Sequence, residues 1–118
     1  MKLRVSRDSV CAGDDIDAHD LVLDLPDAET LDALVVSVLH AYELPRIQGG
    51  KATWCLASRR PIAIVAQQWS SPRMVPWQTQ PASDCKVVDG VVRLHLTYLG
   101  QIDPDVAYEV LRRLRLED

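Results

Sequence analysis

Five residues that could bind a cation lie within seven positions near the N-terminus: Asp14, Asp15, Asp17, His19 and Asp20. A calcium loop needs oxygen ligands at alternate positions, a glycine at the sixth position and a glutamate at the twelfth. Counting from Asp15 places Asp20 at the sixth position and Pro26 at the twelfth, so the spacing excludes a calcium loop of this type. A transition-metal site would need further convergent ligands, and we expect neither a metal nor another cofactor.

The same residues belong to a longer acidic segment. From Asp8 to Asp32 the chain has nine acidic residues and no lysine or arginine, whereas residues 44–83 have five basic residues and no acid. Two interpretations stay open: a solvated acidic loop, or a surface that binds a protein partner. Clustered carboxylates speed the encounter with a basic partner and orient it. Under the second interpretation, the partner-binding residues are Asp14, Asp15, Asp17 and Asp20.

A second candidate surface lies in the proline-containing stretch that follows residue 68. It contains Trp69, Arg73, Met74 and Trp77. Tryptophan, methionine and arginine are enriched at interface cores and hot spots. The alternative is that the two tryptophans close over the edge of the core. We expect Trp69, Arg73 and Trp77 to contribute to partner binding.

Catalysis by a nucleophile would require a serine or cysteine beside a base such as His19, His40 or His95. Sequence spacing does not place such groups together, and no GxSxG, HExxH, P-loop or GxGxxG pattern occurs. We therefore expect a protein without enzymatic activity. A small enzyme or ligand-binding domain that uses His95 and the polar face of its strand stays open as an alternative.

Composition narrows the class of protein. The net charge of -4 disfavours a nucleic-acid binder, because phosphate contacts normally come from a basic patch. The start of the chain does not have the apolar core of a signal peptide, and no run of residues is long and apolar enough to span a membrane. We expect a cytoplasmic protein that binds no membrane. Cys11, Cys55 and Cys85 have no metal-binding spacing and are expected to be buried thiols.

The first half of the chain predicts two strands, a helix and a hairpin. Lys2–Val5 alternates weakly and would suit an edge strand, and Leu21–Leu25 predicts a second, half-buried strand. Thr30 is a suitable N-cap for a helix whose apolar residues recur every three or four positions until Pro45. The stretch Ala52 to Trp69 has no charge on either face of its two arms, which indicates a buried hairpin at the centre of a sheet.

The second half predicts another hairpin and another helix. Asp89-Gly90 is a favoured two-residue turn, and it separates Lys86–Val88 from Val91–Leu99. In the longer run Leu94, Leu96 and Tyr98 alternate with Arg93, His95 and Thr97, so one face should be polar. Asp103-Pro104 should begin a helix whose packed stripe contains Val106, Ala107, Val110, Leu111 and Leu114.

These elements together predict an α+β fold. We expect one domain over residues 1–118, with a mostly antiparallel sheet of about five or six strands and two packed helices. The oligomeric state stays open, including a structural subunit that would self-associate through an apolar rim at Trp69 and Trp77.

Three short sequences, RDSVCAGDD, LPDAETLDAL and GGKATW, together resemble bacterial immunity proteins, which are encoded beside contact-dependent or other polymorphic toxins. The resemblance covers the segment from Lys2 to Trp69. It implies a non-enzymatic inhibitor that binds a toxin domain, often a nuclease, and blocks its active site. Nuclease surfaces are basic because they hold phosphate, so an acidic segment would be complementary to one. The strand, strand, helix order also resembles the start of a ubiquitin-like β-grasp fold, from which the later elements depart.

Overall fold

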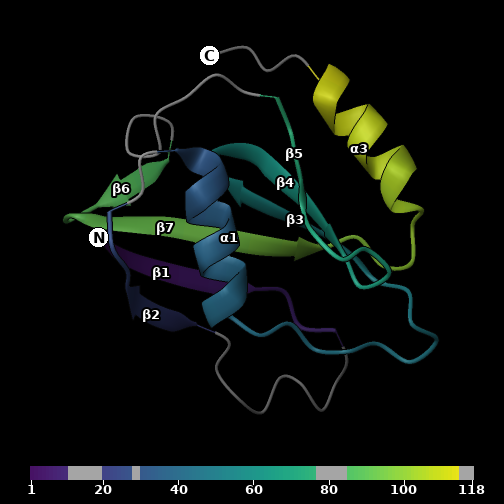
Figure 1. The fold of residues 1–118 in the computed structure, drawn as a ribbon, viewed down its shortest axis with the longest axis horizontal. Helices are drawn as coiled ribbons and strands as arrows, with labels where there is room; N and C mark the ends of the chain where they lie inside the picture. The colour runs from purple at the N-terminus through teal and green to yellow at the C-terminus, as the bar shows by residue number, and fades with distance from the viewer. Residues whose placement is uncertain (11–19, 28–29, 77–84, 115–118) are drawn as a thin grey trace.

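Figure 1 shows the fold as a computed structural model, which describes residues 1–10, 20–27, 30–76 and 85–114. The elements in chain order are β1 (Lys2–Arg7), β2 (Leu21–Asp24), α1 (Leu31–Ala41), β3 (Thr53–Ser58), β4 (Arg60–Ala66), β5 (Arg73–Met74), β6 (Lys86–Val88), β7 (Val91–Tyr98) and α3 (Pro104–Arg113). They confirm the predicted α+β class. Within the described residues, no helix is long and apolar enough to cross a membrane.

All the described strands belong to one sheet. Its order is β2-β1-β7-β3-β4-β5, and β6 pairs with the beginning of β7. The β1–β7 pair is parallel and the other pairs are antiparallel. The edge position considered for the first strand is therefore wrong, because β1 has β2 on one side and β7 on the other. This parallel pairing brings the first residues of the chain beside residues of the last strand.

The central hairpin forms as predicted. Antiparallel pairing joins β3 to β4, and Arg59 makes the reversal between them with a φ of 67°. The second hairpin is also confirmed: Asp89 and Gly90 both have positive φ, 53° and 76°, as a tight turn between β6 and β7 requires.

The main core lies between α1 and one face of the sheet. Thr30 caps α1 as predicted, because its hydroxyl accepts a hydrogen bond from the Ala33 N–H at 3.1 Å. The buried residues Leu31, Leu34, Val35 and Val38 line the helix face toward the sheet. Their partners on the strands include Leu3, Val5, Trp54, Leu56, Leu94 and Leu96. Burying each large apolar side chain contributes about 1.5–3 kcal/mol, so this layer holds the fold together.

Helix α3 contacts β4 and packs on the sheet face opposite α1. Adjacent strand residues point to opposite faces, and Cys55, next to Trp54, belongs with Ile64 and Ala107 in this second, smaller core. Asp103 caps α3 as predicted, accepting from the Asp105 N–H at 2.9 Å.

The predicted packed stripe of α3 is wrong in part. Ala107 is buried and Leu111 packs beside it, as expected. Val106, Val110 and Leu114, however, are 54%, 60% and 39% exposed. The physical reason is that Ala107, Tyr108 and Leu111 form the side of α3 that packs on the sheet. Val106 and Val110 therefore face away from the sheet, and their apolar surface stays exposed.

Candidate functional site

Three cationic side chains lie side by side on the sheet face opposite α1. The β1–β7 register pairs Arg4 with Arg93, and the β6–β7 register pairs Lys86 with Arg93. Directly paired residues project from the same face, so the three charges form one line across three strands. We refer to Arg4, Arg93 and Lys86 as the cationic row.

Little within the described residues neutralises the cationic row. Arg4 Nε lies 3.8 Å from Asp20 Oδ2, in an ion pair that is exposed on both sides. The buried Nε of Arg93 has no hydrogen-bond partner in residues 1–10, 20–27, 30–76 and 85–114. Across the part of the chain that the structure describes, no carboxylate pairs with Arg93 or Lys86. Like charges placed directly opposite one another destabilise a sheet, so the row has an electrostatic cost.

A pocket of about 310 Å³ opens over the cationic row. Its lining includes the whole row, a fourth cation at Arg59, and the polar side chains of Ser6, Ser58, His95 and Asp20. Sequence reasoning placed His95 on a polar strand face, and this is confirmed.

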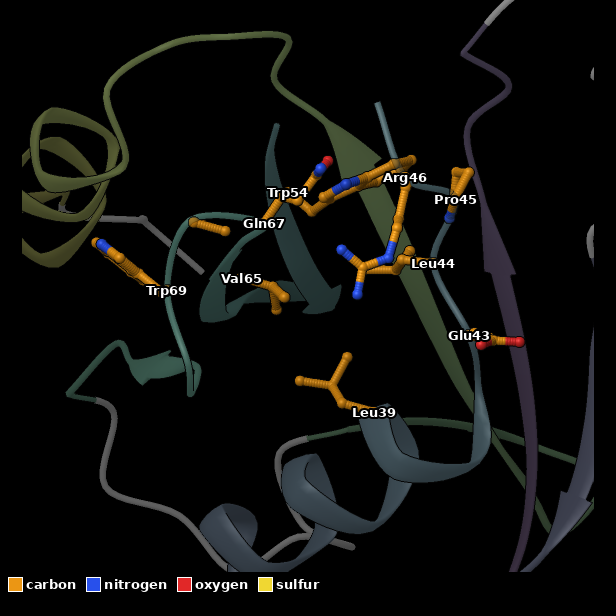
Figure 2. A pocket seen from close by; sticks show the side chains of 10 residues that line it. Leu39, Glu43, Leu44, Pro45, Arg46, Trp54, Val65, Gln67 and Trp69 are labelled. Atoms are coloured by element: carbon orange, nitrogen blue, oxygen red, sulfur yellow. The ribbon is translucent and has the colours of Figure 1, made fainter. Parts of the chain in front are cut away.

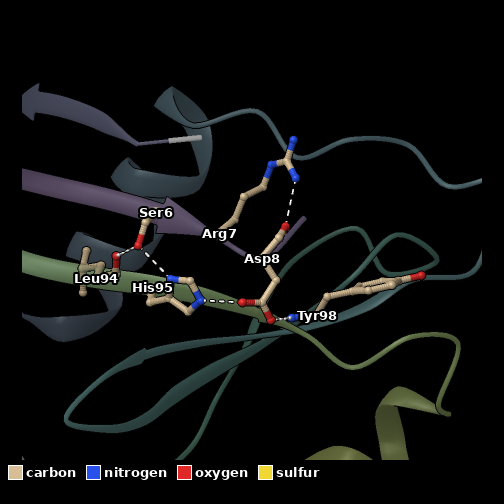
Figure 3. Close-up of polar contacts among 6 residues, drawn as sticks. All are labelled: Ser6, Arg7, Asp8, Leu94, His95 and Tyr98. Atoms are coloured by element: carbon tan, nitrogen blue, oxygen red, sulfur yellow. Dashed lines mark hydrogen bonds and ion pairs between the residues drawn. The ribbon is translucent and has the colours of Figure 1, made fainter. Parts of the chain in front are cut away.

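A hydrogen-bonded chain of side chains borders this pocket (Figure 3). Ser6 Oγ lies 2.7 Å from His95 Nδ1, and His95 Nε2 lies 2.8 Å from Asp8 Oδ1. The other carboxylate oxygen of Asp8 accepts the Tyr98 backbone N–H at 2.9 Å. The chain therefore fixes the imidazole at the pocket and ties the end of β1 to β7.

His95 Nε2–H donates to the Asp8 carboxylate, and Ser6 Oγ faces His95 Nδ1. The Ser6 hydroxyl also lies 3.5 Å from the Leu94 carbonyl oxygen, which is a second acceptor for its proton. The order serine, histidine, aspartate is that of a nucleophilic triad, in which the carboxylate orients the imidazole. Here the ring nitrogens are exchanged relative to that triad, and Ser6 lies within a strand rather than on an exposed turn. We interpret the chain as a clamp between strands that orients His95.

The Asp8 carboxylate is ionised at neutral pH. Partial burial pushes its pKa upward, but the hydrogen bonds from His95 and the Tyr98 N–H and the charge interaction with His95 outweigh it, so the pKa lies below its ordinary value. A carboxyl whose pKa is lowered by folding stabilises the fold above its unfolded pKa, about 4. That contribution is lost as the pH falls through the folded-state pKa.

Replacing Asp8 by asparagine should therefore destabilise the protein in a pH-dependent manner. We expect a loss of about 1 kcal/mol at pH 7, a modest value because the carboxylate is 41% exposed and screened by solvent. The difference from the wild-type protein should shrink as the pH falls through the lowered folded-state pKa of Asp8, because the wild-type carboxyl then loses its charge as well. Urea unfolding at pH 7, 5 and 3 measures this difference. Glu43→Gln removes an exposed carboxylate elsewhere and serves as the control; an equal loss in both variants would contradict the clamp.

A second cluster joins β5 to α3. The Arg73 guanidinium lies over the rings of Trp69 and Tyr108, 4.5 and 5.0 Å from their centroids, and its Nη1 is 3.1 Å from Asp105 Oδ1. Guanidinium–ring contacts of this kind contribute about 0.5–1 kcal/mol at exposed sites. Trp69 and Arg73, two of the predicted partner-binding residues, are thus brought together beside α3.

A second pocket, of about 580 Å³, is larger than the pocket over the cationic row and lies where α1 ends (Figure 2). Its lining combines apolar side chains, including Leu39, Trp54 and Val65, with the charged Glu43 and Arg46. The side chain of Gln67, at its border, is already occupied: Oε1 accepts the Ile47 N–H at 2.8 Å and Nε2 donates to the Ile47 carbonyl at 3.3 Å. This pocket therefore combines an apolar floor with one engaged amide, and Glu43 and Arg46 are its charged groups.

The other predicted site residues fall in two groups. Asp14, Asp15, Asp17, His19 and Trp77 lie outside the described residues. Asp20 lies at the rim of the cationic pocket, so it partly neutralises a basic surface rather than extending an acidic one.

Sequence reasoning missed Arg4, Ser6 and Asp8 as pocket or clamp residues. The alternation of Lys2, Arg4 and Ser6 was a signal for a polar strand face, but it did not identify the partner strand.

The cysteines behave as buried thiols where the structure describes them. Cys55 and Cys85 are buried, and burial raises the pKa of the Cys55 thiol to about 11. Cys55 is thus a thiol at neutral pH and a poor nucleophile or metal ligand. Cys11 lies outside the described residues. The described residues contain no group of three or more histidine, cysteine or acidic side chains that could hold a metal ion.

Comparison of the chain with protein-family models, with curated proteins and with solved structures found no match.

Proposed function

We propose that this protein is a non-enzymatic immunity protein that binds a cognate toxin domain and neutralises it. The observation that carries the proposal is the apolar stripe on the outer side of α3. Ile102, Val106, Val110 and Leu114 are spaced four residues apart and are between 39% and 60% exposed. Within α3, Val106 and Val110 lie one turn apart on the same side of the helix and form a ridge, whereas Ile102 precedes the helix and Leu114 follows it as the C-cap residue. Contiguous exposed apolar surface of this kind marks interaction sites.

The surroundings of the stripe match the anatomy of a protein interface. A shallow, mostly apolar depression lies between Val106 and Val110 and is bordered by Asp105, Glu109 and Arg113. Glu109 pairs with Arg112 and Arg113 at 3.0 and 3.2 Å, which holds these rim charges in place. An apolar centre inside a polar rim is the usual arrangement of a recognition surface.

The Trp69–Arg73 cluster extends this surface. Arg73 is held by Trp69, Tyr108 and Asp105, yet its side chain is 48% exposed. An arginine that is already positioned loses less conformational entropy on binding, and arginine and tryptophan are frequent hot-spot residues. We infer that the ridge of α3 supplies the apolar contact and that Arg73 supplies a charged anchor at its edge.

The partner we propose is a basic toxin domain. The acidic residues from Asp8 to Asp32 and the net charge of -4 favour encounter with a basic surface. Asp14, Asp15 and Asp17 would act mainly on the rate of association, because clustered charges steer encounter more than they add affinity. No catalytic step is part of the proposed function.

The proposal requires that a large secreted protein with a C-terminal toxin domain be encoded beside this gene, and the experiment pairs the protein with that domain. We expect Val106→Asp and Val110→Asp each to weaken binding by about 30-fold or more, the effect of losing an interface hot spot. Calorimetric titration and survival of cells that express the toxin domain measure the effect. The matched control is Val36→Asp, since Val36 on α1 has the same 60% exposure as Val110.

Two outcomes would contradict the assignment of this surface. Equal loss of binding in Val36→Asp and Val110→Asp would show that the effect is not local to α3. A Val110→Asp variant that changes the sedimentation coefficient of the protein alone, and leaves toxin binding unaltered, would assign the stripe to self-association instead.

A further inference from the structure

Repulsion between the like charges of the cationic row destabilises the free protein, and the described residues offset it only in part. Arg93 lies between Arg4 and Lys86 in the register, so each neighbour repels it across the sheet. Among the described residues, Asp20 pairs only with Arg4, at 3.8 Å, and the buried Arg93 Nε has no hydrogen-bond partner. Positions that destabilise the free protein are typical of binding sites, where a ligand supplies the missing interaction.

We propose that the pocket over the cationic row binds the phosphate group of a small molecule. An arginine presents a planar fork of N–H donors that fits a phosphate, and a lysine adds a flexible charge. Arg93 and Lys86 are adjacent and face the same pocket, which Arg59 also lines. A volume of about 310 Å³ matches the lower end of the range for small-molecule sites. Asp20 lies at the rim beside Arg4, so the phosphate is placed toward Arg93, Lys86 and Arg59.

Two further features favour a local site over a general attraction for anions. The protein as a whole has a net charge of -4 and repels anions, so any phosphate binding must come from a concentrated patch. His95 is held at the same pocket by the contacts with Ser6 and Asp8. The clamp thus fixes the imidazole ring as one wall of the pocket; both ring nitrogens are engaged, so the contacts with phosphate come from the cationic side chains. The proposed phosphate site uses residues separate from the stripe on α3. Its test therefore does not depend on whether the protein binds a toxin domain.

The experiment titrates pyrophosphate into the whole protein at low ionic strength, with calorimetry and thermal unfolding as readouts. The wild-type protein should bind one equivalent and gain thermal stability beyond that given by sodium chloride at equal ionic strength. Arg93→Gln and Lys86→Gln should each weaken pyrophosphate binding by about tenfold or more. The matched control is Arg46→Gln, which removes one exposed positive charge at the other pocket and should leave binding unchanged.

The stability of the ligand-free protein gives a second, independent readout. Lys86→Gln removes one repelling charge from the row, so the ligand-free variant should unfold at a higher temperature than the wild-type protein. A purely structural role for Lys86 would lower that temperature instead. The combination of a more stable free protein and weaker pyrophosphate binding supports the site.

Three results would overturn the proposal. One is stabilisation of the wild-type protein by pyrophosphate no greater than that by sodium chloride. Another is equal weakening by Arg93→Gln and Arg46→Gln. The last is a single-stranded oligonucleotide that binds while pyrophosphate does not, because that would indicate diffuse contact with a phosphate backbone rather than a pocket for one phosphate group.

Discussion

Replacing Trp54 by alanine should lower the free energy of unfolding by about 3–5 kcal/mol, the usual cost of removing a large aromatic side chain from a core. Trp54 is 1% exposed and lies on β3 in the core beneath α1. Its ring packs against Tyr98 with centroids 4.8 Å apart and planes tilted by 44°, a geometry that adds to the effect of burial. Domains of this size are stable by only about 5–15 kcal/mol, so the loss would be a large fraction of the total.

Urea unfolding followed by circular dichroism measures the effect, since that signal does not depend on the removed tryptophan. Trp69→Ala is the comparison within the same chain, because Trp69 is only partly buried and packs near α3 rather than in the main core. We expect a clearly smaller loss for Trp69→Ala. A loss of less than about 1 kcal/mol for Trp54→Ala would contradict the packing described for β3.

The second large effect concerns the buried hydroxyl of Ser58, which joins three strands. Ser58 is 4% exposed. Its Oγ donates to the Arg93 carbonyl at 2.6 Å and accepts the Lys86 N–H at 2.7 Å. Ser58→Ala removes both hydrogen bonds and leaves a backbone donor and an acceptor without this partner. We expect a loss of about 2 kcal/mol, because unsatisfied buried polar groups cost about 1–3 kcal/mol each and partial relaxation recovers some of that.

Hydrogen exchange gives the sharper test of the Ser58 prediction. The Lys86 amide should exchange faster in Ser58→Ala, since it loses its acceptor, whereas amides in α1 should change only as global stability changes. Ser37→Ala on the exposed side of α1 should be close to neutral in stability. Unchanged protection of the Lys86 amide would show that this hydroxyl does not hold β6 in place.

Ser58 also connects the fold to the cationic pocket. It anchors both Arg93 and Lys86 through their backbone groups, and those residues form two thirds of the cationic row. Most of the pocket lining is therefore placed by strands of the sheet, with Arg59 at the turn between β3 and β4 and Asp20 just before β2. The stripe on α3 is separate from it, so the two proposed surfaces can be tested with different variants.

Local sequence chemistry determined most of the secondary structure. Thr30 and Asp103 were identified as helix caps and Asp89-Gly90 as a turn, because caps and turns depend on a few adjacent residues. The uncharged faces of the central hairpin and the alternation around His95 likewise predicted buried and polar strand faces correctly. These features need no knowledge of distant residues.

Tertiary structure alone decided the candidate sites, because they depend on pairing between distant parts of the chain. Ser6 and His95 are 89 residues apart, and Arg4 meets Arg93 only because β1 lies parallel to β7. Strand alternation predicts which residues share a face, but the register and the neighbouring strand are set by packing of the whole core. The same holds for α3: its sequence has apolar residues on more than one side, and only docking on the sheet decided that Ala107 is buried while Val110 stays exposed.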